Sequence, residues 1–126
     1  PKLAVSNTPT TNQVLSWNGT ALAWATPSAG GAPVYNFRNI TASTTAVAGD
    51  FIFADTTSGG ITITLPTPSA SAMVRVKRLN PSGNSLQIAA PAGGSVIDGV
   101  GVGTHTMNNQ YDSNDFLSNG TNWYRV

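Results

Sequence analysis

Short segments of alternating hydrophobicity, each ended by glycine, proline or asparagine, are the feature that most restricts the fold of this chain. In Ile61–Pro66, ITITLP, two isoleucines and Leu65 alternate with threonines, and proline follows at once. A period of two residues is typical of a β-strand with one buried face, and proline ends a strand because it has no amide hydrogen to donate. No segment keeps a period of 3.6 residues, so we expect no helix longer than a turn or two.

The same alternation recurs along most of the chain. Further strands are expected in VYNFRNI, DFIFAD, MVRVKRL, SLQIAA and THTM, around residues 96–98, and in the closing NWYRV. Turn signals separate these segments at intervals of about 8–12 residues, which is typical of a β-sandwich or barrel. We therefore predict an all-β protein whose main domain is a jelly-roll-like β-sandwich.

The composition excludes several classes of protein. The chain has 126 residues, only 9% of them charged, and its net charge is +1, which argues against a nucleic-acid partner. It contains no cysteine, so it has neither disulfides nor a thiolate metal site. No apolar run approaches the roughly 20 residues of a membrane helix, and we expect no membrane insertion. The sequence begins at Pro1 rather than methionine, so we expect a fragment or a processed piece.

Residues 1–33 differ from the rest and are expected to form a collar or stalk before a head domain at residues 34–126. The run SAGGAP at Ser28–Pro33 has the composition of a linker. Before it, Asn18-Gly19 lies between two apolar segments, which is typical of a β-hairpin with a type I′ turn. An isolated hairpin is marginal in water. We therefore expect sister chains to bury its apolar side chains, with the subunit interface formed by Trp17, Leu22 and Trp24.

The phrase Leu-Ser with Asn-Gly-Thr and tryptophan occurs near both ends, in LSWNGTALAW and in LSNGTNWYRV. Five positions separate Gly19 from Trp24, but three separate Gly120 from Trp123. A duplicated unit would keep one spacing, so we interpret the phrase as one turn device used twice. The second copy closes the main domain, and Trp123 is expected to lock the last strand.

We expect no enzyme, no catalytic residue and no cofactor. The chain has one histidine, His105, and no Gly-x-Ser-x-Gly motif. Asp112 and Asp115 in YDSND are the one candidate pair of catalytic carboxylates, such as a polysaccharide depolymerase would need. The commoner role of such a sequence is a turn capped by aspartate. His105 is expected in a strand and is a metal or anion ligand only if a homotrimer places three copies around its axis.

Two further groups of side chains are candidates for a binding role. The basic cluster RVKR at Arg75–Arg78 is expected to guard a solvated strand edge, with Val74 and Val76 on the opposite face from Arg75 and Lys77. Aromatic side chains beside amides and hydroxyls suit sugars, although aromatics in β domains more often belong to the core. The residues predicted to bind a receptor or glycan are Tyr111, Asp112, Asn114 and Asp115.

The order of several motifs resembles the distal domains of bacteriophage tail fibres and related receptor-binding virion proteins. These motifs are ITLP at Ile63–Pro66, VRVK at Val74–Lys77, LQI at Leu86–Ile88, IDG at Ile97–Gly99 and SNGTNWYRV at Ser118–Val126. In addition, NQVLSWNG is similar to a phrase common in phage fibres, with Asn12 where glycine is usual. The likeness covers about residues 12–24 and 44–126.

The resemblance implies a homotrimer of β-rich chains on the surface of a virion, in contact with other virion proteins and with a glycan or protein of the host cell surface. Its role would be host attachment. Two alternatives stay open: a capsid fibre, decoration or assembly domain without a receptor site, and a carbohydrate-binding module of a secreted bacterial protein.

Overall fold

The computed structural model describes residues 4–27, 35–100 and 103–126, and these contain strands and turns but no helix. The all-β prediction is confirmed. The chain divides into two compact units, Pro1–Ala32 and Pro33–Val126, one residue from the expected boundary. The predicted linker at Ser28–Pro33 lies outside the described residues. Within the described part, no helix is available that could span a membrane.

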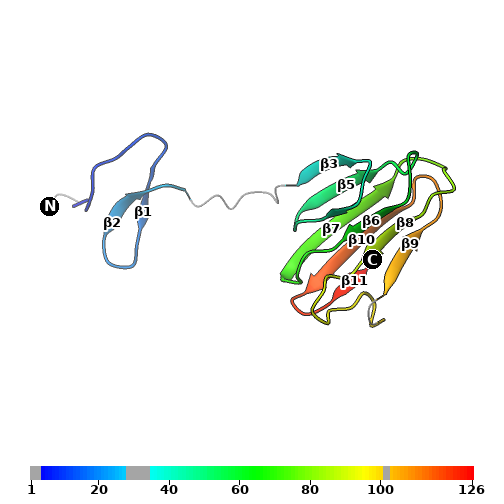
Figure 1. The fold of residues 1–126 in the computed structure, drawn as a ribbon. Coiled ribbons are helices and arrows are strands. Elements are labelled where there is room, and N and C mark those ends of the chain that lie inside the picture. Colours follow the sequence, from blue (N-terminus) through cyan, green and yellow to red (C-terminus); the bar gives the residue numbers. More distant parts are fainter. Residues whose placement is uncertain (1–3, 28–34, 101–102) are drawn as a thin grey trace. The chain divides into compact units, whose positions relative to one another are not determined.

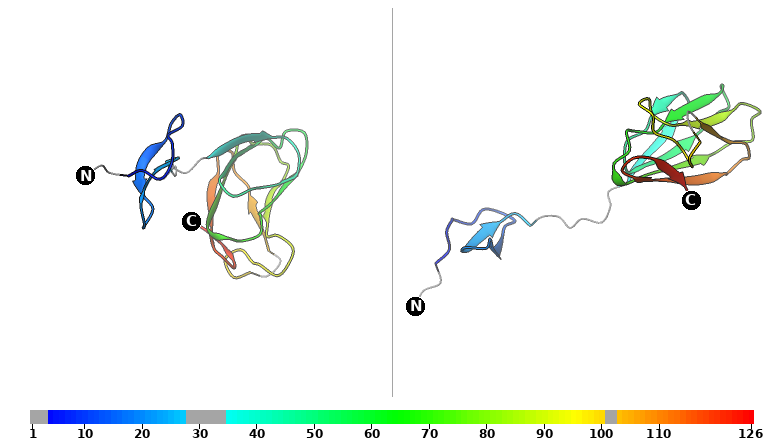
Figure 2. Two further views of the ribbon diagram at one scale, coloured as in Figure 1. Left: turned by 90° about the vertical axis from the view of Figure 1, so that its left-hand side faces the viewer. Right: turned by 90° about the horizontal axis from the view of Figure 1, so that it is seen from below.

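In the first unit, β1 (Val14–Trp17) and β2 (Leu22–Ala25) form an antiparallel hairpin. The second unit contains two sheets that face each other as layers (Figures 1 and 2). The five-stranded sheet has the order β11-β10-β7-β5-β3, with the bounds Trp123–Arg125, Ser113–Asn119, Ala70–Arg78, Asp50–Ala54 and Asn36–Ile40. The four-stranded sheet has the order β4-β6-β8-β9, with the bounds Thr44–Thr45, Ile61–Thr64, Leu86–Ala89 and Thr104–Met107.

The direction of the strands differs from that of a jelly roll. From β3 to β8 the chain alternates between the two sheets, so β3, β5 and β7 pair in parallel, and so do β4, β6 and β8. Among the described strands of the second unit, the antiparallel pairs are those that involve β9, β10 and β11. A jelly roll is antiparallel, so this part of the prediction is corrected. Alternation along a strand identifies its buried face, but it contains no information on which strand pairs with which.

The core lies between the two sheets and follows the predicted alternation. Ile61, Ile63 and Leu65 are buried, as are Val74 and Val76. The indole of Trp123 is also fully buried, and its Nε1–H donates to the carbonyl of Pro66 at 3.0 Å. The expectation that Trp123 locks the last strand is therefore confirmed.

The prediction that RVKR guards a strand edge is wrong, because β7 is the central strand of its sheet. Its last residue, Arg78, is 2% exposed. The guanidinium donates to the carbonyls of Asn80 at 2.9 Å, Met107 at 2.7 Å and Asn84 at 2.8 Å, and also to that of Ser82. Arg78 thus joins the loop after β7 to the end of β9 from inside the domain.

Both Asn-Gly turns are built alike, as expected, but they are not two-residue type I′ turns. Residues 18–21 form the first loop. The side-chain oxygen of Asn18 accepts hydrogen bonds from the backbone amides of Thr20 and Ala21, and Gly19 has a φ of 95°. Asn119 and Gly120 repeat this geometry, with φ of 97° at the glycine. The asparagine side chain closes each four-residue turn, so positive φ is needed at glycine alone.

Candidate functional site

The outward side of the five-stranded sheet carries a cluster of aromatic and basic side chains. We call it the outer aromatic face and define it by Tyr35, Phe37, Phe51, Phe53, Arg75 and Lys77. It exists because β5 buries Asp50, Ile52 and Ala54 and so turns its phenylalanines outward. The parallel register then places Phe37 beside Phe51 on the same side of the sheet.

The rings of this face contact one another. Tyr35 meets Phe51 edge to face with centroids 4.7 Å apart, and the rings of Phe37 and Phe51 are 5.3 Å apart. Phe37 also stacks with Phe53 at 6.4 Å and an angle of 13°. Even so, Phe37 is 66% exposed. An exposed aromatic patch of this kind is typical of an interaction surface.

Arg75 covers one end of the aromatic cluster. Its guanidinium carbon lies 4.7 Å from the centroid of Phe51, and both Nε and Nη2 donate to the carboxylate of Asp115 on β10. Hydrogen bonding to Asp115 raises the pKa of Arg75 above its usual value. This bidentate ion pair fixes the guanidinium and neutralises its charge.

Lys77 has different surroundings. Its Nζ donates to the carbonyl of Tyr111 at 3.1 Å and lies 5.7 Å from the centroid of the Tyr111 ring. Lys77 and Arg75 line a hollow of about 290 Å³ together with Phe37, Phe51, Ile52, Phe53 and Ser113. The hollow therefore combines ring faces with basic side chains and a hydroxyl.

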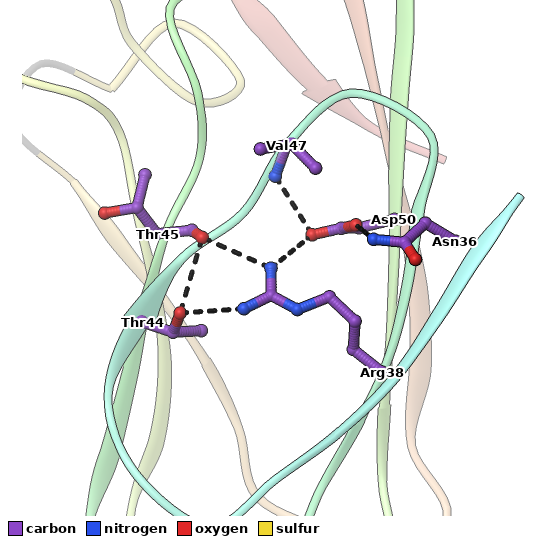
Figure 3. Close-up of polar contacts among 6 residues, drawn as sticks. All are labelled: Asn36, Arg38, Thr44, Thr45, Val47 and Asp50. Atoms are coloured by element: carbon purple, nitrogen blue, oxygen red, sulfur yellow. Dashed lines mark hydrogen bonds and ion pairs between the residues drawn. The ribbon is translucent and has the colours of Figure 1, made fainter.

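A polar cluster around the buried Asp50 holds β3, which carries Phe37, in place (Figure 3). Asp50 is fully buried and accepts hydrogen bonds from Asn36 Nδ2 at 2.8 Å, Arg38 Nη1 at 2.6 Å and the amide of Val47 at 3.0 Å. Arg38 also donates to Thr44 Oγ1 at 3.0 Å. Since Thr44 belongs to β4, Arg38 links the edge strands of both sheets.

The four residues predicted to bind a receptor do not form one site. Tyr111 and Asp115 lie beside the outer aromatic face through Lys77 and Arg75. Asp112 caps a turn by accepting from the amide of Asn109 at 2.9 Å, as the commoner role of the sequence predicts. In β10, successive side chains point to opposite faces, so Asn114 points away from the side that Asp115 occupies.

Asp112 and Asn114 instead line a separate polar hollow of about 270 Å³. Its other lining residues are His105, Thr106, Asn108, Asn109, Ser113 and Arg125. His105 lies in β9, as expected for a strand residue, and Arg125 Nη1 approaches its Nδ1 to 3.1 Å. Partial burial, and then the positive charge of Arg125, lower the pKa of His105.

The lowered pKa of His105 predicts a pH dependence of stability. Between the ordinary pKa near 6.5 and the lower folded value, the unfolded chain binds the proton more readily than the folded chain does. The contribution of neutral His105 to the free energy of unfolding is therefore complete above about pH 6.5. It is lost as the pH falls through the pKa of His105 in the folded chain. His105→Gln removes it, so we expect the urea-unfolding free energy of the wild type to fall more between pH 7.5 and 5.5 than that of the variant. Equal losses in both proteins would contradict this assignment.

The hairpin presents a second apolar surface. Leu15 pairs with Trp24, and Trp17 pairs with Leu22, so all four side chains share one face. Trp17 is 63% and Leu15 is 42% exposed, whereas Leu22 and Trp24 are half-buried. This is the face that the sequence assigns to subunit contacts, and the interface itself stays a prediction.

Sequence reasoning missed most of the outer aromatic face because it expected aromatics in the core. Trp123 is buried, but Tyr35 and Tyr124 are each 40% exposed and Tyr111 is 61% exposed. The alternation in DFIFAD did contain a signal for this face. Its small and branched side chains alternate with the two phenylalanines, so burying the former turns the rings outward. Across the described residues, no group of three or more histidine or acidic side chains is placed to hold a metal ion.

Comparison with protein-family models finds no match, and comparison with curated proteins finds no significant match.

Proposed function

We propose that this chain is a structural fibre domain of a bacteriophage virion that attaches the particle, as a homotrimer, to a glycan on the host surface through the outer aromatic face. The observation that carries the proposal is the exposed aromatic cluster beside basic and hydroxyl groups on one side of the five-stranded sheet. The apolar faces of sugar rings pack against aromatic rings, while polar side chains bind their hydroxyls. Strands hold such groups more firmly than loops do. The motif order described above supports the virion assignment.

Phe37→Ala tests this function. Because Phe37 is 66% exposed and contacts the rings of both Phe51 and Phe53, we expect binding to the recognised member of a panel of purified bacterial surface polysaccharides to weaken at least about tenfold. The free energy of unfolding should change little. Isothermal titration calorimetry measures the first quantity and urea unfolding the second. Val47→Ala, which shortens an exposed side chain outside the hollow, is the matched control.

One observation favours the second candidate function, assembly without a receptor site. Apolar side chains continue across the same sheet side through Met73, Leu117 and Tyr124, and a wide apolar face also suits a subunit contact. Light scattering separates the two functions. The proposal expects trimers of 13.0 kDa chains for both wild type and Phe37→Ala. Trimers that fall apart in Phe37→Ala, with no polysaccharide bound by the wild type, would favour assembly.

A stable monomer that still binds polysaccharide would instead favour the third candidate, a carbohydrate-binding module of a secreted bacterial protein. That result would overturn the fibre assignment but leave the binding face intact.

A further inference from the structure

The two basic side chains of the hollow differ in how their charge is balanced. Arg75 is paired with Asp115 in a bidentate ion pair. Among the residues that the structure describes, the ion pairs are those of Arg38, Arg75 and Arg125, and Lys77 has no carboxylate within 4.0 Å. Its one acceptor is a backbone carbonyl. Since an ammonium group carries three donors, Lys77 keeps two of them and its full positive charge for a ligand.

The lining of the hollow lacks any acidic side chain. Its residues are aromatic, aliphatic, basic or, in Ser113, hydroxylic. Asp115 is nearby, but its two oxygens are occupied by Arg75. An anion entering the hollow would therefore meet an unbalanced positive charge and no acidic side chain in the lining, which is the condition for electrostatic complementarity.

The position of Lys77 beside the rings of Phe37 and Phe53 indicates how far a ligand's anionic group can lie from its ring. In the parallel register of β5 and β7, Phe53 and Lys77 are direct partners, and adjacent strands lie about 4.8 Å apart. Phe37 stacks with Phe53 on the other side. A single cyclic residue placed on these rings thus brings a substituent on its edge within reach of the ammonium group.

We propose, building on the glycan-binding function above, that the saccharide recognised by the outer aromatic face is acidic, with a sugar ring packed on Phe37 and Phe53 and its anionic group bound by Lys77. A carboxylate and a phosphate present the same chemistry to an ammonium group. Uronic acids and phosphorylated sugars are therefore both members of the class.

The test is calorimetric titration of the whole chain with three purified bacterial polysaccharides: one containing uronic acid, one containing phosphate and one neutral. The proposal expects at least one acidic polymer to bind more tightly than the neutral polymer and to weaken as salt is raised. Lys77→Met should weaken that binding about 10- to 100-fold, as expected when a charge-assisted hydrogen bond is lost. Lys77→Arg should retain most of it. Arg125→Met, which removes a cation outside the hollow, is the matched control and should change little.

The outcomes separate this inference from the function on which it rests. If the neutral polymer binds as tightly as the acidic ones, and binding responds to Phe37→Ala but not to Lys77→Met, the acidic class is overturned while glycan binding stands. If none of the polymers binds and Phe37→Ala dissociates the oligomer, both proposals are overturned and a second copy of this chain occupies the face. Which acidic polymer binds identifies the anionic group as carboxylate or phosphate.

Discussion

Arg78→Met is expected to lower the free energy of unfolding by about 3–5 kcal/mol. The guanidinium of Arg78 is 2% exposed and donates to four backbone carbonyls, which the thioether of methionine leaves without a partner. Each buried polar group that loses its partner costs about 1–3 kcal/mol, and the removed charge offsets part of the sum because its burial was itself costly. Urea unfolding followed by tryptophan fluorescence measures the loss.

Two controls make this result specific to Arg78. Lys77→Met removes a positive charge from the adjacent residue, but the Lys77 side chain lies on the outward side, so the free energy of unfolding should change by about 0.5 kcal/mol or less. Arg78→Lys keeps the charge but lacks the planar fork, and it should lose most of the same stability. A loss below about 1 kcal/mol in both Arg78 variants would show that the carbonyls find other partners.

Asp50→Ala is expected to cost a similar amount, about 3–5 kcal/mol, because it leaves the Arg38 charge without its partner. Asp50 is fully buried and accepts three hydrogen bonds, from Asn36, Arg38 and Val47. Their loss affects the edge strand β3 first, because Asn36 and Arg38 both belong to it. Faster amide hydrogen exchange confined to β3 at low denaturant would be the local signature of this loss.

A double-mutant cycle with Arg38→Met measures how much of that cost belongs to the ion pair. We expect a coupling energy of about 0.5–3 kcal/mol between the two positions. Thr45→Ala, at an exposed position on neighbouring β4, is the matched control and should leave β3 exchange unchanged. Additive effects of Asp50→Ala and Arg38→Met would show that the two side chains act independently.

The alternation in the sequence was sufficient to locate most strands of the main unit. In ITITLP and MVRVKRL it also identified the buried face, because apolar side chains at every second position leave one arrangement that excludes them from water. The paired Asn-Gly phrases were likewise interpreted correctly as one device used twice. The predicted type I′ turn was wrong. The Asn-Gly pair also fits a four-residue loop, which the asparagine side chain closes with hydrogen bonds to the backbone.

The proposed binding surface was much less accessible to prediction. The outward phenylalanines of β5 were missed, because hydrophobicity alone places such rings in the core. Asp112 and Asn114 were grouped with Asp115 on the basis of their closeness in sequence, yet adjacent residues of a strand point to opposite faces. Arg78 looked like a surface residue because its partners, three carbonyls of the following loop and the Met107 carbonyl at the end of β9, leave no mark in the local sequence.

The sequence by itself determined that this chain is built of short strands, where most of them lie and which residues of several strands are buried. These properties depend on side-chain period and turn chemistry, which act over a few residues. The tertiary structure decided that β3, β5 and β7 run parallel, that Arg78 is buried, and that Phe37, Phe53 and Lys77 share one hollow. Those features arise from register and pairing between strands distant in the chain, and no local pattern encodes a partner that the chain reaches only on folding.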